Sequence, residues 1–411
     1  MNTLFIVGSR GIPADYGGFE TFAEELATGL AARGHSVYVT CERTTSDAQG
    51  PSTYRGVELL YVTAPDNNLR TIVADVKALW RCYRLAESGD VVYLLGYGVG
   101  LFGWPVLKAL QAKGVRVWLN PDGIEWKRSR WSVWAQAYLR FSEWFLPRYV
   151  DRVICDSEAI ESHHLQNGGL SAARTDVIEY GAPVVQREDL SATVIRRRNE
   201  FLSRYNLGPG DYYIQIGRLV PENNLDLMIR GVLDDRIQRR LLIVANRQEN
   251  EAFYRSLRRR VEAAGASDQV LFVGTIYDQP LLQAFRVGAH AHLHGHEVGG
   301  TNPVLVEAMG VGNLILSLNT PFNREVLGEA GLFFGKSVES FVRALCRAER
   351  LSDAQVQEFR RRAINRVRTH YNWTHVTDKY EERIWGGAPS PVTSSASTGT
   401  EAEAVSSPRS C

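Results

Sequence analysis

The stretch that decides the fold is Gly295-His296-Glu297-Val298-Gly299-Gly300-Thr301-Asn302-Pro303-Val304-Leu305-Val306-Glu307-Ala308-Met309-Gly310. Gly299 and Gly300 predict a tight turn that a ligand can approach closely, because glycine has no Cβ atom. Thr301 or Asn302 can cap a following helix, and Pro303 suits the first turn of that helix. The stretch is therefore typical of a strand end, a glycine turn and a helix start.

A helix start of this kind favours a phosphate group, because its free N–H groups and the positive end of its dipole attract anions. Glu307 lies about one turn beyond Pro303, where its carboxylate can accept hydrogen bonds from a sugar hydroxyl. The motif alone leaves two interpretations open. One is a sugar-nucleotide site, with the diphosphate on the helix end and the ribose on Glu307. The other is a buried turn in which Glu307 only caps the helix.

The composition indicates a soluble globular protein with more than one domain. The chain has 411 residues, which exceeds one ordinary core, and it is 44% hydrophobic and 23% charged. A net charge of +1 excludes a global attraction to nucleic acid, and we expect no nucleic-acid partner. The scattered cysteines indicate reduced thiols and a cytoplasmic location. The apolar runs are too short for a signal peptide or a membrane span.

Hydrophobic patterning predicts alternating strands and helices along most of the chain. Strands are expected at 4–8, 36–41, 58–62, 91–95, 116–120, 152–155, 176–179, 212–217, 241–244, 270–273, 289–293, 314–317 and 331–334. Helices are expected at 19–33, 69–88, 131–149, 337–350, 353–370 and 373–385. Such alternation favours parallel, doubly wound sheets. It pauses after Gly181-Ala182-Pro183 and then restarts, so we predict two similar α/β domains in tandem.

The predicted domains are residues 1–185 and 186–370, followed by a closing helix at 371–386 and a disordered tail at 387–411. Ligands of open parallel sheets bind beyond the carboxyl ends of the strands, so the cleft between the domains is the expected site. Gly17 and Gly18, after the first strand, are expected to approach a phosphate from the opposite wall. The alternative is a flexible connector in which Glu20 caps the helix.

A different function is suggested by Gly98-Val99-Gly100-Leu101-Phe102-Gly103, which matches the dinucleotide fingerprint and has Asp122 about twenty residues on. This match is the basis of the alternative hypothesis, an NAD(P)-dependent oxidoreductase. It follows the fourth expected strand rather than the first, and Asp122 lies in a turn signal, Asn120-Pro121-Asp122-Gly123. We therefore rank this hypothesis second.

Acidic, basic and aromatic residues follow that turn: Glu125, Trp126, Lys127, Arg128, Arg130 and Trp131. Interleaving of basic and aromatic residues suits a membrane interface or single-stranded nucleic acid. Alternatively, the aromatic residues belong to the core and the basic ones are solvated. A third hypothesis, without catalysis, is a membrane-docked scaffold that uses this region. Asp122 and Glu125 are candidates for proton transfer.

The second half opens with Arg218 at a strand end, where a guanidinium can pair with phosphate and neutralise a leaving diphosphate. Glu222 is a candidate for sugar contact, and the alternative is an ion pair between these two residues. Alternate histidines also occur at 290, 292, 294 and 296. We predict no metal site, because no further Cys/His cluster and no Asp-x-Asp pair accompanies them.

Together these residues resemble glycosyltransferase family four, whose enzymes have the two-domain, metal-independent type B fold. The resemblance is carried by the strings at 11–22, 120–128, 221–224 and 299–303, and by Gly217-Arg218, Asp156-Ser157-Glu158 and Pro303…Glu307-Ala308-Met309. It runs from residue 1 to about residue 385. The longer strings are similar to a subgroup that includes bacterial rhamnosyltransferases of capsule and cell-wall polysaccharide assembly. The resemblance also implies that the last helix, with Trp373, crosses back to the first domain.

The resemblance implies retaining, metal-independent transfer of a hexose or deoxyhexose, with rhamnose preferred, and no cofactor. The donor would be a dTDP-, UDP- or GDP-linked sugar, and the acceptor a lipid-linked saccharide at the inner membrane surface. The implied donor residues are Gly17, Gly18, Arg218, Glu297, Gly299, Gly300, Thr301, Asn302 and Glu307. The implied catalytic residues are Asp122, Asp156, Arg218 and Glu222. Acceptor or membrane contacts would come from Glu125, Trp126, Lys127, Arg128, Arg130 and Trp131.

Three positions depart from the family pattern. An acid is usual where Gly299 stands, and Glu297 is the candidate to replace it. A phosphate-binding lysine is usual where Asn223 stands, and the turn at 120–122 replaces a histidine of the first domain. Neutralisation of the diphosphate is therefore expected to depend more on Arg218 and the helix ends.

Overall fold

The computed structural model describes residues 2–14, 17–43, 50–65, 70–121, 123–127, 132–168, 170–248 and 250–386. Asp122, Arg128, Arg130, Trp131 and the tail at 387–411 lie outside the described residues, as does the side chain of Lys127. Expectations for these positions stay predictions. None of the helices in the described ranges combines the length and the apolar content that a bilayer-spanning helix needs.

The first lobe is built on an eight-stranded sheet with the order β3-β4-β2-β1-β5-β6-β7-β8. Its strands are β1 (Leu4–Val7), β2 (Val37–Arg43), β3 (Thr53–Tyr54), β4 (Val57–Thr63), β5 (Val91–Leu95), β6 (Arg116–Asn120), β7 (Arg152–Cys155) and β8 (Thr175–Val177). Among the described strands only β3 and β4 pair antiparallel, and the sequence pattern missed β3 because two residues show no alternation. Every residue of β5, Val-Val-Tyr-Leu-Leu, is buried, as expected for a parallel strand with helices on both faces.

Five helices complete the first lobe: α1 (Gly18–Ala32), α2 (Arg70–Leu85), α3 (Gly100–Ala112), α4 (Val133–Phe145) and α5 (Glu158–Gly168). One buried cluster joins α1 to one face of the sheet, and another joins α2, α3 and α4 to the other face. Helix α3, which contains Pro105, is not among the helices predicted from the sequence pattern. Pro105 lies inside α3, where it removes one hydrogen bond between successive helical turns.

The second lobe has a six-stranded parallel sheet with the order β11-β10-β9-β12-β13-β14. The strands are β9 (Tyr212–Ile216), β10 (Arg240–Val244), β11 (Val270–Gly274), β12 (Ala291–His294), β13 (Ile315–Leu318) and β14 (Leu332–Phe334). The helices are α6 (Ala192–Ser203), α7 (Leu225–Val232), α8 (Glu251–Ala263), α9 (Gln279–Gly288), α10 (Pro303–Gly310), α11 (Pro321–Leu327), α12 (Val338–Glu349) and α13 (Asp353–His370). In both sheets the strand order reverses beside the first strand, between β1 and β5 and between β9 and β12. Loops that leave these strands lie where doubly wound folds bind ligands.

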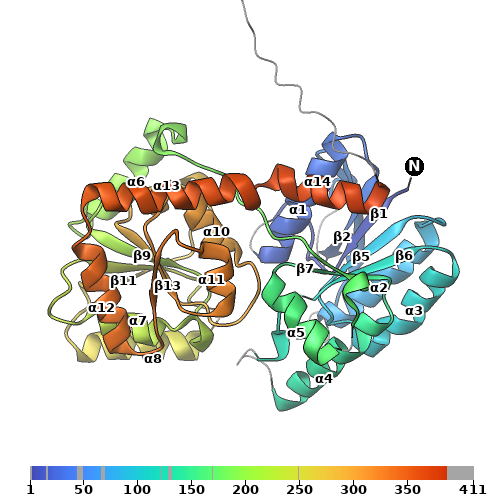
Figure 1. Cartoon of the computed structure of the whole chain (residues 1–411), viewed down its shortest axis with the longest axis horizontal. Coiled ribbons are helices and arrows are strands. Elements are labelled where there is room, and N and C mark those ends of the chain that lie inside the picture. Colours follow the sequence, from blue (N-terminus) through green and yellow to red (C-terminus); the bar gives the residue numbers. More distant parts are fainter. Residues whose placement is uncertain are drawn as a thin grey trace, which may run out of the picture.

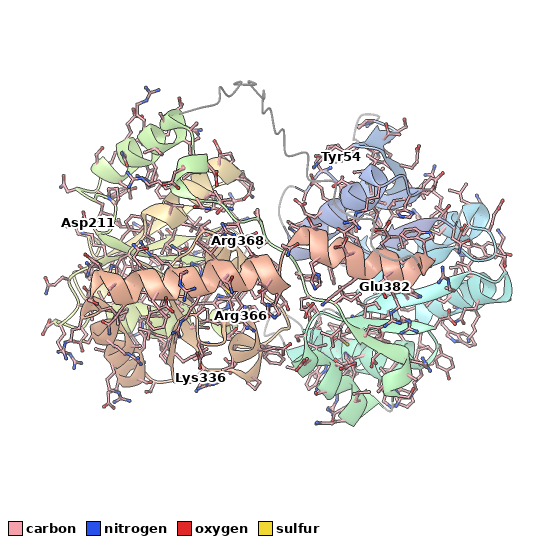
Figure 2. The ribbon with its side chains drawn as sticks, turned by 45° about the horizontal axis from the view of Figure 1, so that its top comes forward. Tyr54, Asp211, Lys336, Arg366, Arg368 and Glu382 are labelled. Carbon is pink, nitrogen blue, oxygen red and sulfur yellow. The ribbon has the colours of Figure 1, made fainter. Side chains whose placement is uncertain are left out.

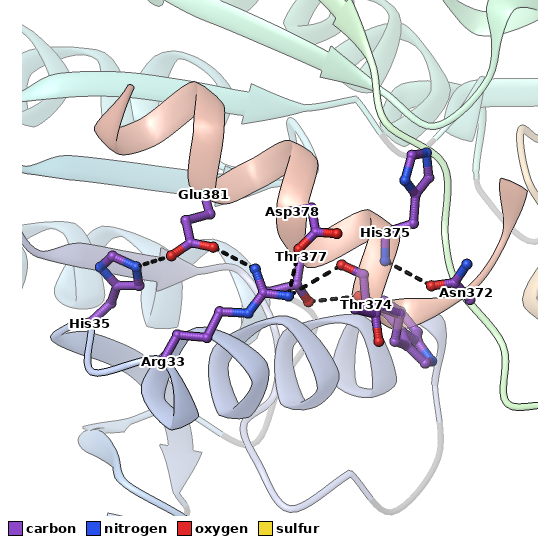
Figure 3. Close-up of polar contacts among 9 residues, drawn as sticks. Arg33, His35, Asn372, Thr374, His375, Thr377, Asp378 and Glu381 are labelled. Carbon is purple, nitrogen blue, oxygen red and sulfur yellow. Dashed lines mark hydrogen bonds and ion pairs between the residues drawn. The ribbon is translucent and has the colours of Figure 1, made fainter. Parts of the chain in front are cut away.

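The last helix, α14 (Trp373–Trp385), leaves the second lobe and packs on α1 of the first (Figure 1). Arg33, at the end of α1, pairs with Asp378 at 2.7 Å and with Glu381 at 2.5 Å (Figure 3). His35 contacts the same Glu381 at 2.6 Å and stacks on Trp385. The expected α/β class, with two tandem Rossmann-like sheets and a crossing C-terminal helix, is confirmed.

Candidate active site

Two glycine turns face each other where the lobes meet. Gly17 precedes α1 with a φ of 145°, and Gly299 has a φ of 144°, a conformation that favours glycine. A Cβ atom added to Gly18 would lie 3.5 Å from Cγ of Pro303, so the starts of α1 and α10 lie in contact. Asn302 caps α10 by accepting a hydrogen bond from the Val304 N–H at 3.0 Å. Two helix N-termini therefore converge, which is an arrangement suited to an anion.

The turn at 299–301 is seated on the first lobe. A Cβ atom on Gly300 would lie 1.7 Å from Oδ1 of Asp156, so glycine is required here while that carboxylate keeps its place. The Thr301 hydroxyl donates a hydrogen bond to the backbone carbonyl of Asp156. On the other side, a Cβ atom on Gly123 would lie 3.1 Å from Cα of Gly299. Asp156 is only 5% exposed, so its carboxylate supports the glycine turn from beneath.

In the second lobe, the loops after β9 and β12 are bonded to each other. The Asn223 amide donates to the carbonyl of Arg218 at 2.8 Å and contacts Nδ1 of His296 at 2.7 Å. Asn224 has a φ of 54° and donates to the carbonyl of Gly295 at 2.9 Å. The amide at position 223 thus joins two loops, which a lysine side chain could not do in the same way. Arg218 itself is half-buried just beyond the end of β9.

Glu222 and Glu297, the two acids expected near the sugar, lie in loops whose backbones are hydrogen-bonded to each other. The Glu297 N–H donates to the carbonyl of Glu222 at 3.1 Å. The Glu297 carboxylate pairs with Nζ of Lys336, which follows β14, at 2.6 Å. The Glu297 carboxylate is therefore held in an ion pair with a lysine that follows the edge strand. The backbone of Glu297 lies next to the glycine turn, but its carboxylate is not free.

Glu307 forms an ion pair that sequence reasoning missed. Its partner is Arg286, near the end of α9, whose side chain is almost completely buried while that of Glu307 is 24% exposed. The carbonyl of Arg286 accepts a hydrogen bond from Asn313 at 2.7 Å. Among the described residues, Nε and Nη1 of Arg286 have no hydrogen-bond partner. The only signal in the sequence was a cation within the apolar run Ala284-Phe285-Arg286.

Two histidines of the run, His292 and His294, lie on β12 and face the interior, while His290 and His296 lie just before and beyond the strand. His292 is completely buried and His294 is 4% exposed. Burial lowers the pKa of His290 and of His294 to about 4, and it lowers the pKa of His292 well below its ordinary value. These imidazoles are thus neutral at pH 7. Within the described ranges, no group of three or more His, Cys, Asp or Glu side chains is arranged to hold a metal ion.

Gly100 and Gly103 of the dinucleotide-like stretch serve helix packing. Gly100 has a φ of 47°, and a Cβ atom there would lie 2.4 Å from the hydroxyl oxygens of both Ser142 and Tyr138 on α4. A Cβ atom on Gly103 would lie 2.6 Å from the Val99 side chain. The stretch starts α3 and lets it approach α4 closely. Packing therefore accounts for Gly100 and Gly103 without a dinucleotide, whereas a Cβ atom on Gly98 would have no neighbour within 4 Å.

Glu125 and Trp126 lie inside the first lobe rather than on the expected docking surface. Glu125 is 7% exposed, and Trp126 packs against the core beneath Arg140. The Tyr97 hydroxyl lies 3.1 Å from the Gly123 carbonyl, and it accepts a hydrogen bond from the Glu125 N–H at 2.9 Å. These residues fix the turn that faces Gly299. For Trp126 the structure favours the alternative given above, in which the aromatic residues of this region belong to the core.

Buried polar atoms without partners gather at this edge of both sheets. In the described part of the chain, Oγ of Ser9, Oε1 of Gln215 and Nε2 of His294 are buried and make no hydrogen bond. They lie at or near the carboxyl ends of β1, β9 and β12.

Two family models match separate parts of the chain. Residues 200–370 match the family model described as "Glycosyl transferases group 1". This part of the chain is therefore similar to group 1 glycosyltransferases. Residues 1–183 match a second model, described as "Domain of unknown function (DUF1972)". No curated protein matches the chain.

Solved glycosyltransferase structures share the fold over nearly the whole chain. Sucrose-phosphate synthase from Thermosynechococcus elongatus is 18% identical, with a TM-score of 0.77 over 93% of this chain and 98% of that one. The HepE protein of Anabaena, in complex with UDP-glucose, is 17% identical, with a TM-score of 0.71 over 93% and 99%. A trehalose-6-phosphate protein from E. coli, bound to UDP-2-fluoro glucose, is 12% identical, with a TM-score of 0.67 over 93% and 99%. The type B fold of this glycosyltransferase is thereby confirmed.

Proposed function

We propose that this glycosyltransferase binds the diphosphate of a nucleotide sugar between the starts of α1 and α10. The observation that carries the proposal is the contact between Gly18 and Pro303, which brings two helix N-termini to one place. Arg218 lies at the same edge of the second sheet. The donor then occupies mainly residues 186–370, and the acceptor approaches residues 1–185. Solved neighbours that bind UDP and UDP-glucose support a donor of this class.

In the proposed reaction, the bond between C1 of the sugar and the β-phosphate oxygen breaks. The acceptor hydroxyl bonds to C1, with retention of configuration, and gives up its proton. Negative charge grows on the departing diphosphate, where Arg218 and the helix N–H groups stabilise it without a metal. Asp122 and Glu222 remain the candidates for sugar or acceptor contact, and Asp156 acts through the turn that it supports.

Glu307 is proposed to hold the ribose. Its carboxylate is partly exposed on α10, one turn beyond the proposed diphosphate position, and Arg286 engages one of its oxygens. The second oxygen is then oriented toward the cleft edge as an acceptor for ribose hydroxyls.

We further propose a rhamnosyl donor and a lipid-linked saccharide acceptor at the inner face of the plasma membrane, with the protein in the cytoplasm. The strings at 11–22, 120–128, 221–224 and 299–303, with their resemblance to rhamnosyltransferases, support this choice. Lys127, Arg128, Arg130 and Trp131 stay candidates for contact with the acceptor or the membrane.

The test is a donor panel with a lipid-linked acceptor. dTDP-rhamnose, UDP-glucose and GDP-mannose are incubated with the full chain, and release of nucleoside diphosphate is measured. We expect one donor class to be consumed and to bind in calorimetry without acceptor. If no sugar nucleotide is bound or consumed, the proposal is wrong. Consumption of UDP-glucose alone would retain the glycosyltransferase and exclude rhamnose.

A further inference from the structure

Exposed apolar side chains gather on one face of the first lobe, which we call the α3–α4 face. It consists of the outer sides of α3 and α4 and of the turn Leu146–Arg148 with the residue after it. Eleven large hydrophobic side chains are exposed among the described residues. Eight of them lie on this face: Leu101, Phe102, Trp104, Val133, Trp134, Phe141, Trp144 and Tyr149. Single exposed hydrophobic residues are normal on a protein surface, but a contiguous patch of them is characteristic of a surface that contacts another molecule.

Ring contacts make this face continuous. The ring centroid of Trp104 on α3 lies 6.3 Å from that of Phe145 on α4 and 6.1 Å from that of Tyr149. At the start of α3, Phe102 lies 6.1 Å from Tyr138 of α4. The two helices therefore present one aromatic surface.

The outer side of α4 has the spacing of an amphipathic helix turned outward. Val133, Trp134, Ala137, Phe141 and Trp144 are exposed and recur every three or four residues, while Leu139, Ser142 and Glu143 on the other side are buried. A helix that packs inward on one side and carries tryptophan on its outer side is suited to an interface that is partly apolar and partly wet.

The charges on the α3–α4 face are all positive. Lys108 and Arg140 are exposed, and Arg148 lies with its guanidinium 4.1 Å from the ring centroid of Trp144. Neither α3 nor the turn after α4 contains an acid, and Glu143, the acid of α4, is buried. The face thus combines aromatic rings with cations and exposes no described carboxylate.

The α3–α4 face also adjoins the site. The Tyr138 hydroxyl of α4 donates to the carbonyl of Gly98 at 3.0 Å, in the loop that leaves β5 at the cleft edge. In the whole molecule, α4 lies on the side opposite α13 and α14 (Figure 1). A partner held on this face would therefore lie near the acceptor side of the cleft and clear of the crossing helices.

We propose that the α3–α4 face docks on the surface of an anionic lipid bilayer. Its tryptophan, tyrosine and phenylalanine rings enter the headgroup level, and Lys108, Arg140 and Arg148 meet lipid phosphates. A second copy of this chain fits less well, because a symmetric contact of the face with itself would place cation against cation. This proposal rests on the proposed function. It adds the surface through which the protein would reach a lipid-linked acceptor.

Vesicle sedimentation with the full chain tests the docking, in the absence of donor and acceptor. We expect binding to phosphatidylcholine vesicles that contain phosphatidylglycerol, with weaker binding at high salt. The combined variant Phe102→Ser, Trp134→Ser and Phe141→Ser should lose about tenfold or more of the partition coefficient. The variant Lys108→Glu with Arg140→Glu should lose about tenfold on anionic vesicles and little on pure phosphatidylcholine.

Matched controls lie elsewhere on the surface. Tyr277→Ser removes an exposed aromatic residue of the second lobe, and Arg204→Glu with Arg368→Glu reverses two exposed cations there. Both should bind vesicles like the wild type, and thermal melting monitors folding of every variant. Wild-type protein that stays in the supernatant, or α3–α4 variants that bind normally, would overturn the proposal, as would self-association through this face without vesicle binding. Nucleotide-sugar binding is measured separately. If the protein binds no nucleotide sugar, the vesicle experiment still decides whether this face docks on a membrane.

Discussion

Arg218 is the residue on which the proposed chemistry depends most. It lies half-buried just beyond β9, and its carbonyl is held by Asn223. If its guanidinium stabilises the leaving diphosphate, Arg218→Ala should lower kcat by about a hundredfold or more. Steady-state rates at saturating donor measure this effect, with the exposed Arg204→Ala as the control. A kcat within about threefold of the wild type would remove Arg218 from the mechanism.

The pair of Arg286 and Glu307 predicts a preference for ribose. Glu307→Ala should weaken binding of a ribonucleoside diphosphate by about tenfold or more, because a hydrogen bond to a charged group is lost. Its binding of the 2′,3′-dideoxy analogue should change little. Calorimetric affinities for the two nucleotides give the ratio that measures ribose recognition.

Arg286 is expected to influence ribose recognition by positioning Glu307. It should therefore change the ratio of the affinities for the ribonucleotide and for its dideoxy analogue. Arg286→Met should lower the ratio, and Arg286→Lys should restore part of it, because a lysine can still pair with the carboxylate. A purely structural role would weaken both nucleotides equally. If the ratio in Arg286→Met equals that of the wild type, Arg286 does not position Glu307.

At the scale of elements, β12 leads into the glycine turn and carries buried histidines, whose protonation is expected to make stability depend on pH. Its histidines, His292 and His294, face the interior. Burial holds the pKa of His294, and of His290 just before the strand, at about 4, below the ordinary 6.5. Each of these side chains therefore binds fewer protons in the folded protein than in the unfolded chain at intermediate pH. The stability contributed by these neutral side chains is complete above about pH 6.5 and is lost as the pH falls toward 4.

We predict that the free energy of unfolding falls by about 1 kcal/mol per pH unit for each such histidine over this range. His292→Leu removes a buried ring whose nitrogens have no hydrogen-bond partner among the described residues. It should leave stability at pH 7 unchanged or raised, and it should flatten the pH dependence. Denaturant melts from pH 4 to 7 measure both effects. The exposed His370→Leu is the control, and an unaltered slope in His292→Leu would contradict the prediction.

At the scale of the whole molecule, the donor turn belongs to one lobe and its support to the other. The Thr301 hydroxyl bonds to Asp156, and the N–H groups of Glu158 and Ala159 in the first lobe donate to Glu325 in the second. Two chain segments also join the lobes, and Ala182 donates to the carbonyl of Tyr371 where they lie together. Figure 2 shows α13 and α14 spanning both lobes, with Arg366 and Arg368 on α13 and Glu382 on α14. The site therefore depends on how the lobes meet.

Gly300→Ala should disrupt the contact between the two lobes, because the added Cβ atom would lie 1.7 Å from Oδ1 of Asp156. We expect at least about a tenfold loss of kcat/KM, with thermal stability of the separate lobes little changed. The double variant Gly300→Ala with Asp156→Ala removes the clash and should recover part of the loss. A double variant with no more activity than Gly300→Ala would show that the clash is not the cause.

Much of the fold was open to prediction, because strand and helix patterns are local. β5, β6 and β7, and the helices α13 and α14, have the bounds that the pattern predicted. The two-residue β3 and the proline-containing α3 were missed, since their stability comes from neighbours rather than from periodicity. Of the site, the glycine turns, Arg218 and Glu307 were recognised from motif and spacing. Their proposed roles remain to be tested.

The sequence by itself determined the fold class, the two glycine turns and the helix starts, because glycine, proline and capping residues act on the backbone near them. Only the tertiary structure decided which groups face those turns. It placed the Asp156 carboxylate beside Gly300, paired Glu297 with Lys336 and Glu307 with Arg286, buried Glu125 and partly buried Trp126. It also gathered the exposed rings of α3 and α4 into one surface. Such contacts join residues far apart in the chain, and their geometry is set by how sheets and helices pack, which no local pattern contains.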